Sequence, residues 1–100
     1  MAENAVRDGF AQTQRHGRIH YLEAGAGEPL VLMHTNGASA HQYDRVIGAL
    51  AARYRVISWD MPGHGDSEPI GRHYRVADYA DAVTALLDAL GIDRKSTRLN

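Results

Sequence analysis

The apolar run LVLM at Leu30–Met33 is the feature that most constrains how this chain can fold. The loop GAGEP precedes the run and the polar segment HTNG follows it, so turn signals bound it on both sides. A strand with one solvated face would alternate polar and apolar residues, and this run does not. The run therefore predicts a strand buried on both faces, as in a parallel sheet covered by helices.

The segments around this run alternate between strand and helix patterns. Upstream, QTQRHGRIHYLEAG predicts a β-hairpin that turns at His16 and Gly17. Downstream, the apolar spacing predicts a helix from Ser39 to about Arg53, with Ser39 as its cap. RYRVISWD then predicts a strand, and VADYADAVTALLDALG predicts a helix with an apolar stripe that ends at Gly91. The predicted class is α/β, with an N-terminal hairpin followed by β-α-β-α and parallel strands.

Composition limits the classes of function. Eleven Lys and Arg residues against 12 Asp and Glu residues give a net charge of −1, which offers no attraction for nucleic acid or an anionic membrane. The chain has no cysteine, which excludes disulfides and thiolate catalysis. No segment resembles a signal peptide or a membrane span. We expect a soluble, cytoplasmic chain with a small-molecule partner, and the sequence sets no oligomeric state.

Ser39 invites comparison with a catalytic nucleophile because it lies in GASAH. The nucleophile elbow G-x-S-x-G needs a second glycine, because a side chain at that position of the strained turn would collide with neighbouring backbone. His41 stands at that position. The sequence therefore favours a helix cap over a nucleophile at Ser39.

The loop after Leu30–Met33 begins at the carboxyl end of a predicted parallel strand, where open α/β sheets bind ligands. Its residues are His34, Thr35, Asn36 and Gly37. Such a turn can aim backbone N–H groups at a developing oxyanion, and Gly37 permits close approach of the backbone. The alternative, a simple turn before a helix cap, stays open on these grounds.

The glycine-rich loop DMPGHGDSEP follows the second predicted strand. Asp60 at its start is better explained as an acceptor of loop N–H groups than as a triad acid, and a structural role is favoured for His64. His16 and His20 have the spacing of helical metal ligands, but the hairpin pattern excludes a helix there. We expect neither a metal site nor a cofactor.

Four segments in this order, RIHYLEAG, PLVLMH, YRVISWDMPGHGDSEP and YADAVTALLDALGI, resemble the N-terminal part of the α/β-hydrolase fold family. The resemblance covers roughly Arg18 to Ile92. Its most specific piece is the D-x-P-G-x-G-x-S loop from Asp60 to Ser67. It implies an incomplete α/β-hydrolase fold, because the family's nucleophile strand follows the position of Ile92.

The resemblance also assigns roles to the loop after Leu30–Met33. His34 corresponds to the His of the family's His-Gly oxyanion loop, and Asn36 to the residue whose backbone N–H donates to the oxyanion. Thr35 stands where the family usually has Gly, and Gly37 where many members have Pro. The resemblance thus implies Asn36 as the oxyanion donor, with His34 and Thr35 as supporting residues of the loop.

The activity implied for the parent protein is cleavage of an ester, lactone or carbon–carbon bond by a Ser-His-Asp/Glu triad. All three triad members are expected beyond Ile92, so this chain alone is expected to be inactive. The loop differs from the His-Gly-x-Pro form of dehalogenases and epoxide hydrolases, which use an Asp nucleophile, and this favours Ser. Two alternatives stay open: a non-catalytic α/β binding protein, and an Asp-nucleophile dehalogenase or epoxide hydrolase.

Residues 93–100, DRKSTRLN, are polar where the family has an apolar strand. The codons GAT CGG AAG AGC ACA CGT CTG AAC encode this string and resemble a common sequencing adapter. We therefore expect residues 1–92 to be the N-terminal portion of a single hydrolase domain, and residues 93–100 to be a non-native tail. The strand Leu30–Met33 is then expected to form an open edge of the sheet.

Overall fold

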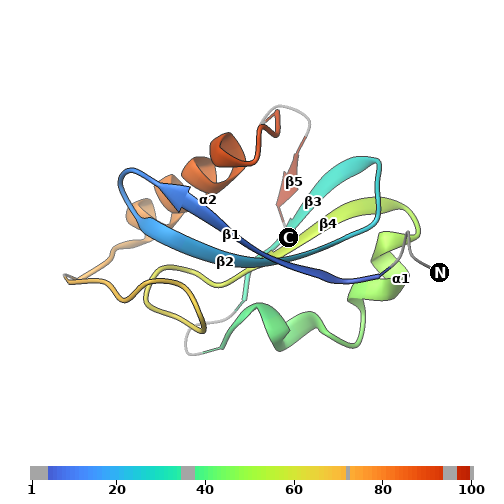
Figure 1. Ribbon diagram of the computed structural model, residues 1–100, viewed down its shortest axis with the longest axis horizontal. Coiled ribbons are helices and arrows are strands. Elements are labelled where there is room, and N and C mark those ends of the chain that lie inside the picture. Colours follow the sequence, from blue (N-terminus) through green and yellow to red (C-terminus); the bar gives the residue numbers. More distant parts are fainter. Residues whose placement is uncertain (1–4, 35–37, 72, 94–96, 100) are drawn as a thin grey trace.

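The computed structural model describes residues 5–34, 38–71, 73–93 and 97–99 (Figure 1). The strands and helices follow the predicted alternation. In chain order they are β1 (Arg7–Thr13), β2 (Gly17–Ala24), β3 (Glu28–Leu32), the 3₁₀ helix η2 (Ala40–Tyr43), α1 (Ile47–Ala51), β4 (Tyr54–Trp59), α2 (Val76–Ala89) and β5 (Arg98–Leu99).

The strands of the described residues form one mixed sheet in the order β1-β2-β4-β3-β5. β1 and β2 pair antiparallel and form the predicted hairpin, in which Gly17 has a φ of 69°. That value lies in the left-handed region, which glycine adopts without a steric penalty. β2 is antiparallel to β4, whereas β3 and β4 are parallel, so the predicted parallel pair is confirmed.

Helices cover both faces of the sheet, with α2 on one side and η2 and α1 on the other (Figure 1). Successive side chains of a strand point to opposite faces, so the buried apolar residues form two clusters, one on each face of the sheet. Val31 and Ile57 pack with α2, whereas Leu30 and Val56 pack with α1. β3 is therefore buried on both faces toward its carboxyl end, as the apolar run predicts.

Two details of the predicted helices are wrong. The single helix expected from Ser39 to about Arg53 is broken into η2 and α1. The backbone of Ala40 bonds to side chains of β4 and the loop after it instead of entering one continuous helical ladder. Val76 is the first apolar residue of the stripe predicted over VADYADAVTALLDALG, yet it is 86% exposed. It lies in the first turn of α2, and the buried residues of that helix begin at Ala82.

The expected open edge at β3 is also wrong in part. Residues Leu30 and Val31 pair in parallel with Arg98 and Leu99 of β5. An unpaired edge presents backbone N–H and C=O groups, and any extended segment within reach can bond to them. The segment that does so here belongs to residues 93–100.

The C-terminal end of α2 agrees with the prediction. Leu90 is the C-cap, and Gly91 follows with a φ of 70°. The Gly91 N–H donates to the Asp88 carbonyl, and the Ile92 N–H donates to the Leu87 carbonyl. These bonds satisfy carbonyls that the helix end would otherwise leave unpaired.

Candidate functional site

The candidate site lies at the carboxyl edge of β3 and β4, where His34 and Asp60 follow the two strands. Because β2 runs antiparallel to β4, the β1–β2 turn lies at this same edge (Figure 1). The edge therefore brings together three segments that are far apart in the sequence: the turn, the loop after β3 and the loop after β4. Ligands of open α/β sheets bind at such an edge.

His34 is buried, with 5% of its surface exposed. Its Nε2 accepts a hydrogen bond of 3.0 Å from the Met61 backbone N–H. Because an N–H group can only donate, this Nε2 carries no proton. The His34 ring also packs against the His64 ring, with 4.9 Å between centroids. His34 thus joins the start of the loop after β3 to the loop after β4.

Thr35, Asn36 and Gly37 lie outside the described residues, so their predicted roles stay predictions. The residue before His34 is nevertheless held in place. The Tyr43 hydroxyl donates to the Met33 carbonyl at 2.6 Å, and the Trp59 indole N–H contacts the Met33 sulfur at 3.2 Å. The entrance to the loop is thereby bonded to η2 and to β4.

The far end of the same loop is fixed at Ala40. Its carbonyl accepts a hydrogen bond of 2.6 Å from the Ser58 hydroxyl, and its N–H donates to the Asp60 carboxylate at 2.6 Å. Ser39 precedes it as the cap of η2, and its hydroxyl oxygen accepts from the His41 N–H at 3.3 Å. The predicted capping role of Ser39 is confirmed.

Asp60 is the central acceptor of this edge and is 1% exposed. Besides Ala40, its carboxylate accepts from the Asp66 N–H at 2.8 Å and contacts His20 Nδ1 at 2.8 Å. Burial by itself raises the pKa of Asp60, but the N–H donors of Ala40 and Asp66 and the His20 ring outweigh it and lower that pKa. The predicted role of Asp60 as an acceptor of loop N–H groups is confirmed.

His20 is almost fully buried and lies between two carboxylates. Its Nδ1 contacts Asp60 at 2.8 Å, and its Nε2 contacts Asp8 of β1 at 2.7 Å. Burial lowers the pKa of His20, but the hydrogen bonds to Asp8 and Asp60 outweigh it and the pKa is raised. The charged ring is thus stabilised by both carboxylates.

The glycine-rich loop after β4 folds around Asp60. The Ser67 hydroxyl donates to the Asp60 carbonyl at 2.6 Å, and a Cβ on Gly65 would collide with the Asp60 carboxylate. His64 Nδ1 contacts the Pro62 carbonyl at 3.1 Å. The loop therefore needs glycine where the chain passes its buried carboxylate, and these contacts fit the structural role predicted for His64.

One group of side chains at this edge has the composition of a cation site. Ligand atoms of His20, Asp60 and Asp66 lie within 4.8 Å of one another. His20 Nδ1 and Asp60 Oδ2 already bond to each other, and the same Asp60 oxygen accepts from the Asp66 N–H. A metal ion would have to replace these bonds, so the contacts explain the group without one.

Two clusters at this edge were not predicted from the sequence. His20 joins Asp8 and Asp60, which are 12 and 40 residues away along the chain. His16 joins Tyr74 and Asp81 in the same way, across 58 and 65 residues. The contact of His20 with Asp8 needs the pairing of β1 with β2, and its contact with Asp60 needs the register of β2 on β4. The His16 contacts need the β1–β2 turn to lie against α2, and spacing within one segment reveals none of these arrangements.

Comparison with known proteins identifies the family. A family model described as alpha/beta hydrolase fold matches residues 28–95. Haloalkane dehalogenase 2 of Mycobacterium tuberculosis is 39% identical over 79 residues, which are 78% of this chain and 28% of the dehalogenase. The soluble epoxide hydrolase of a Corynebacterium species is 40% identical over 77 residues, 77% of this chain and 27% of the relative.

Solved structures agree with the sequence relatives. The N-acyl homoserine lactonase AidH superposes with a TM-score of 0.77 and 34% identity, over 88% of this chain and 34% of the lactonase. The chain spans less than a third of the length of these two sequence relatives. The described residues contain no helix long and apolar enough to cross a membrane. On the strength of the matched family model and these relatives, the chain belongs to the α/β-hydrolase fold family.

Proposed function

We propose that this chain is the N-terminal portion of a hydrolase that cleaves an ester, lactone or carbon–carbon bond through a Ser-His-Asp/Glu triad. In this proposal the loop of residues 34–40 supplies part of the oxyanion hole, and the triad comes from sequence beyond Ile92. This chain alone is then inactive toward the parent's substrate. The substrate is a small molecule, and the protein acts in the cytoplasm.

The observation that carries the proposal is the anchoring of that loop at both ends. Met61 bonds to His34 at one end, and Asp60 bonds to Ala40 at the other, at 3.0 and 2.6 Å. Stabilisation of an oxyanion requires donors that are already oriented before charge develops. The bonds at the two described ends of the loop, His34 and Ala40, support this proposal.

Asn36 is the proposed oxyanion donor through its backbone N–H. His34 supports the loop by fixing its first residue, and Thr35 supports it from the position beside the donor. The contribution of Asn36 does not depend on its side chain, since a backbone N–H donates. Removal of one oxyanion donor typically costs about 10²–10³ in kcat, so the loop has a large share in catalysis under this proposal.

A second candidate function uses an Asp nucleophile in place of Ser and acts on a haloalkane or an epoxide. Two of the relatives, at 39% and 40% identity, are a haloalkane dehalogenase and an epoxide hydrolase. They favour an Asp nucleophile that forms a covalent ester, which water then hydrolyses. The lactonase relative, at 34% identity, supports acyl chemistry instead.

The experiment that separates these functions begins with the genomic sequence downstream of codon 92. A G-x-S-x-G after one further strand supports the triad, and Asp at the central position supports the second candidate. A central position that holds neither Ser nor Asp supports a binding protein. The complete protein is then assayed with a p-nitrophenyl ester, an epoxide and a haloalkane. Replacing the elbow serine by Ala should abolish ester hydrolysis, and retained turnover would refute the triad.

The same genomic sequence tests the proposed boundary at residue 92. We propose that residues 1–92 belong to one hydrolase domain and that residues 93–100 are not part of the natural protein. One set of codons that encodes DRKSTRLN matches a common sequencing adapter, and this supports the proposal. A genome that encodes DRKSTRLN after Ile92 would contradict it.

A further inference from the structure

A pocket of about 340 Å³ opens beside the β1–β2 turn, and its lining residues include none of the residues to which the proposed oxyanion hole gives a role. Residues 15–17 of the turn, residues 68–71 and Tyr74 line it. Tyr74 lies two residues before α2. The pocket thus places a phenol hydroxyl beside an imidazole, in a part of the molecule that the proposed hydrolase function does not use.

Three side chains here form a linear array. His16 Nδ1 lies 2.7 Å from the Tyr74 hydroxyl, and His16 Nε2 lies 2.7 Å from the Asp81 carboxylate. The two ring nitrogens of His16 therefore face a weak acid on one side and a carboxylate on the other. A nucleophile, a base and a group that orients the base have this relation in nucleophilic catalysis.

Hydrogen-bond chemistry fixes the direction of the array. The Arg15 and His16 side chains hold the pKa of Asp81 at about 2, so its carboxylate is ionised and can only accept. His16 Nε2 must therefore carry the proton in this contact. In the neutral ring Nδ1 then has a lone pair, and the Tyr74 hydroxyl donates to it.

The base of the array is held in place before any ligand arrives. The His16 backbone N–H donates to the Thr13 hydroxyl at 3.0 Å, and only 7% of the surface of His16 is exposed. Arg15 binds the same Asp81 carboxylate through two nitrogens, at 2.8 and 3.1 Å. A buried, oriented imidazole loses little freedom when it takes up a proton, which is the condition for general-base catalysis.

We propose that Tyr74 is an activated nucleophile that accepts an acyl group from an activated ester bound in this pocket. The phenol oxygen attacks the ester carbonyl carbon as its proton passes to His16 Nδ1. The new oxygen–carbon bond forms and the bond to the leaving alcohol breaks, after which His16 returns the proton to the departing oxygen. The product is an aryl ester on Tyr74, and no oxidant or metal ion takes part.

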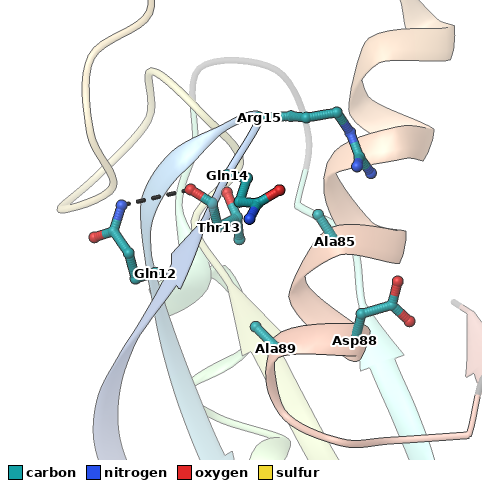
Figure 2. A pocket seen from close by; sticks show the side chains of 7 residues that line it. All are labelled: Gln12, Thr13, Gln14, Arg15, Ala85, Asp88 and Ala89. Carbon is teal, nitrogen blue, oxygen red and sulfur yellow. Dashed lines mark hydrogen bonds between the residues drawn. The ribbon is translucent and has the colours of Figure 1, made fainter.

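A second hollow, of about 280 Å³, lies between β1 and α2 and offers a comparison (Figure 2). Figure 2 shows Arg15 reaching from the turn toward α2, with Ala85 and Ala89 on the facing helix. The one hydroxyl among the lining residues belongs to Thr13 and donates to the Gly17 carbonyl at 2.8 Å. This hollow therefore has no nucleophile bonded to a base.

The test uses this chain and p-nitrophenyl acetate as the acyl donor, with acetylation resolved by residue in peptide mass spectra. Tyr54, which is half-buried like Tyr74 and lies at the start of β4, is the internal reference. General-base catalysis contributes about 10²–10⁴-fold, so Tyr74 should be acetylated about 100-fold faster than Tyr54. The chain contains no G-x-S-x-G, so an elbow serine cannot compete for the acetyl group.

Variants then assign the rate to the array. His16→Gln should remove the preference for Tyr74, and Asp81→Asn should reduce it. Tyr54→Phe, the matched control, should leave the rate of Tyr74 acetylation itself unchanged. Equal acetylation of Tyr74 and Tyr54 in the unmodified chain would overturn the proposal without reference to any variant. A preference that survives His16→Gln in a chain with unchanged circular dichroism would also overturn it. Neither result bears on the proposed oxyanion loop, whose nucleophile lies elsewhere.

Discussion

His16 and His20 are four residues apart, and each joins an aspartate to a second group from a distant segment. His20 contacts Asp60, whose side chain is 1% exposed, whereas His16 contacts Asp81, whose side chain is 45% exposed. The contacts are of similar length, 2.8 and 2.7 Å. The same side-chain chemistry thus serves a buried network in one place and a partly solvated one in the other.

The difference in burial determines what each network contributes. A buried charge that loses its partner is left uncompensated, which is strongly destabilising, whereas solvent replaces the partner of an exposed charge. The Asp60 network also binds the backbone of Ala40 and Asp66, so it holds two loops. The Asp81 network holds one turn against α2 and leaves the Tyr74 hydroxyl beside a pocket. We expect the first to dominate stability and the second to matter for reactivity.

The largest effect is expected for Asp60→Ala. The substitution leaves His20 and the N–H groups of Ala40 and Asp66 without their acceptor in a buried site. The free energy of unfolding should fall by about 3–5 kcal/mol, measured by urea denaturation. Asp44→Ala is the control, because the described contacts of the Asp44 side chain are with the exposed ring of His41. It should change stability by less than about 0.5 kcal/mol.

Similar losses for the two variants would break the distinction between buried and solvated networks. An intermediate loss for Asp60→Ala, near 1 kcal/mol, would mean that water enters and replaces the carboxylate.

The second prediction concerns the pH dependence of the buried pair. The pKa of Asp60 is lowered in the folded chain, so its contribution is present above pH 3.8 and lost as pH falls through the lowered value. The pKa of His20 is raised, so its contribution is complete below pH 6.5 and lost as pH rises through the raised value. The contribution of Asp60 and His20 to the urea midpoint should therefore be largest between pH 3.8 and 6.5.

His20→Gln separates the two limbs of that profile. It should remove the decline on the alkaline side and keep an acidic decline from Asp60, which retains its N–H donors. An alkaline decline of the same size in His20→Gln would assign it to another group.

The third and smaller effect is expected for Asp81→Asn. The pKa of Asp81 is about 2 because of Arg15 and His16, so its contribution is present above pH 3.8 and lost as pH falls toward 2. Asp81→Asn should lower the urea midpoint less than Asp60→Ala at neutral pH. The difference from the unmodified chain should shrink as pH falls through about 2, and a difference that stays constant from neutral pH to below pH 2 would contradict the assignment.

Local sequence patterns were sufficient for most of the fold. The apolar run at Leu30–Met33 predicted a strand buried on both faces, and Gly17 and Gly91 marked a turn and a helix end that the structure contains. Local patterns failed where tertiary contacts decide. Ala40 bonds to Ser58 and Asp60, which divides the helix expected from Ser39 to about Arg53.

The site could be predicted only in part for the same reason. The position of Asp60 at the end of a strand, before a glycine-rich loop, was enough to predict that it accepts loop N–H groups. No local pattern links His16 to Tyr74 and Asp81, because that contact depends on how the hairpin lies against α2. Spacing within a segment reveals which face a residue occupies, whereas contacts between segments need the register of the sheet.

Among the three networks compared, the smallest effect is expected for the exposed ion pair between Arg98 of β5 and Glu28 of β3. Their side chains are 63% and 42% exposed, and Arg98 Nε lies 2.7 Å from the Glu28 carboxylate. Exposed pairs contribute about 0–1 kcal/mol, so Glu28→Gln should change the free energy of unfolding by less than about 1 kcal/mol, and salt should reduce even that. The backbone pairing of β5 with Leu30 and Val31 does not need the charge. If Glu28→Gln lowered the free energy of unfolding as much as Asp60→Ala, the ion pair and not the backbone pairing would hold β5 to the sheet. Burial would then no longer explain the order of the effects at Asp60, Asp81 and Glu28.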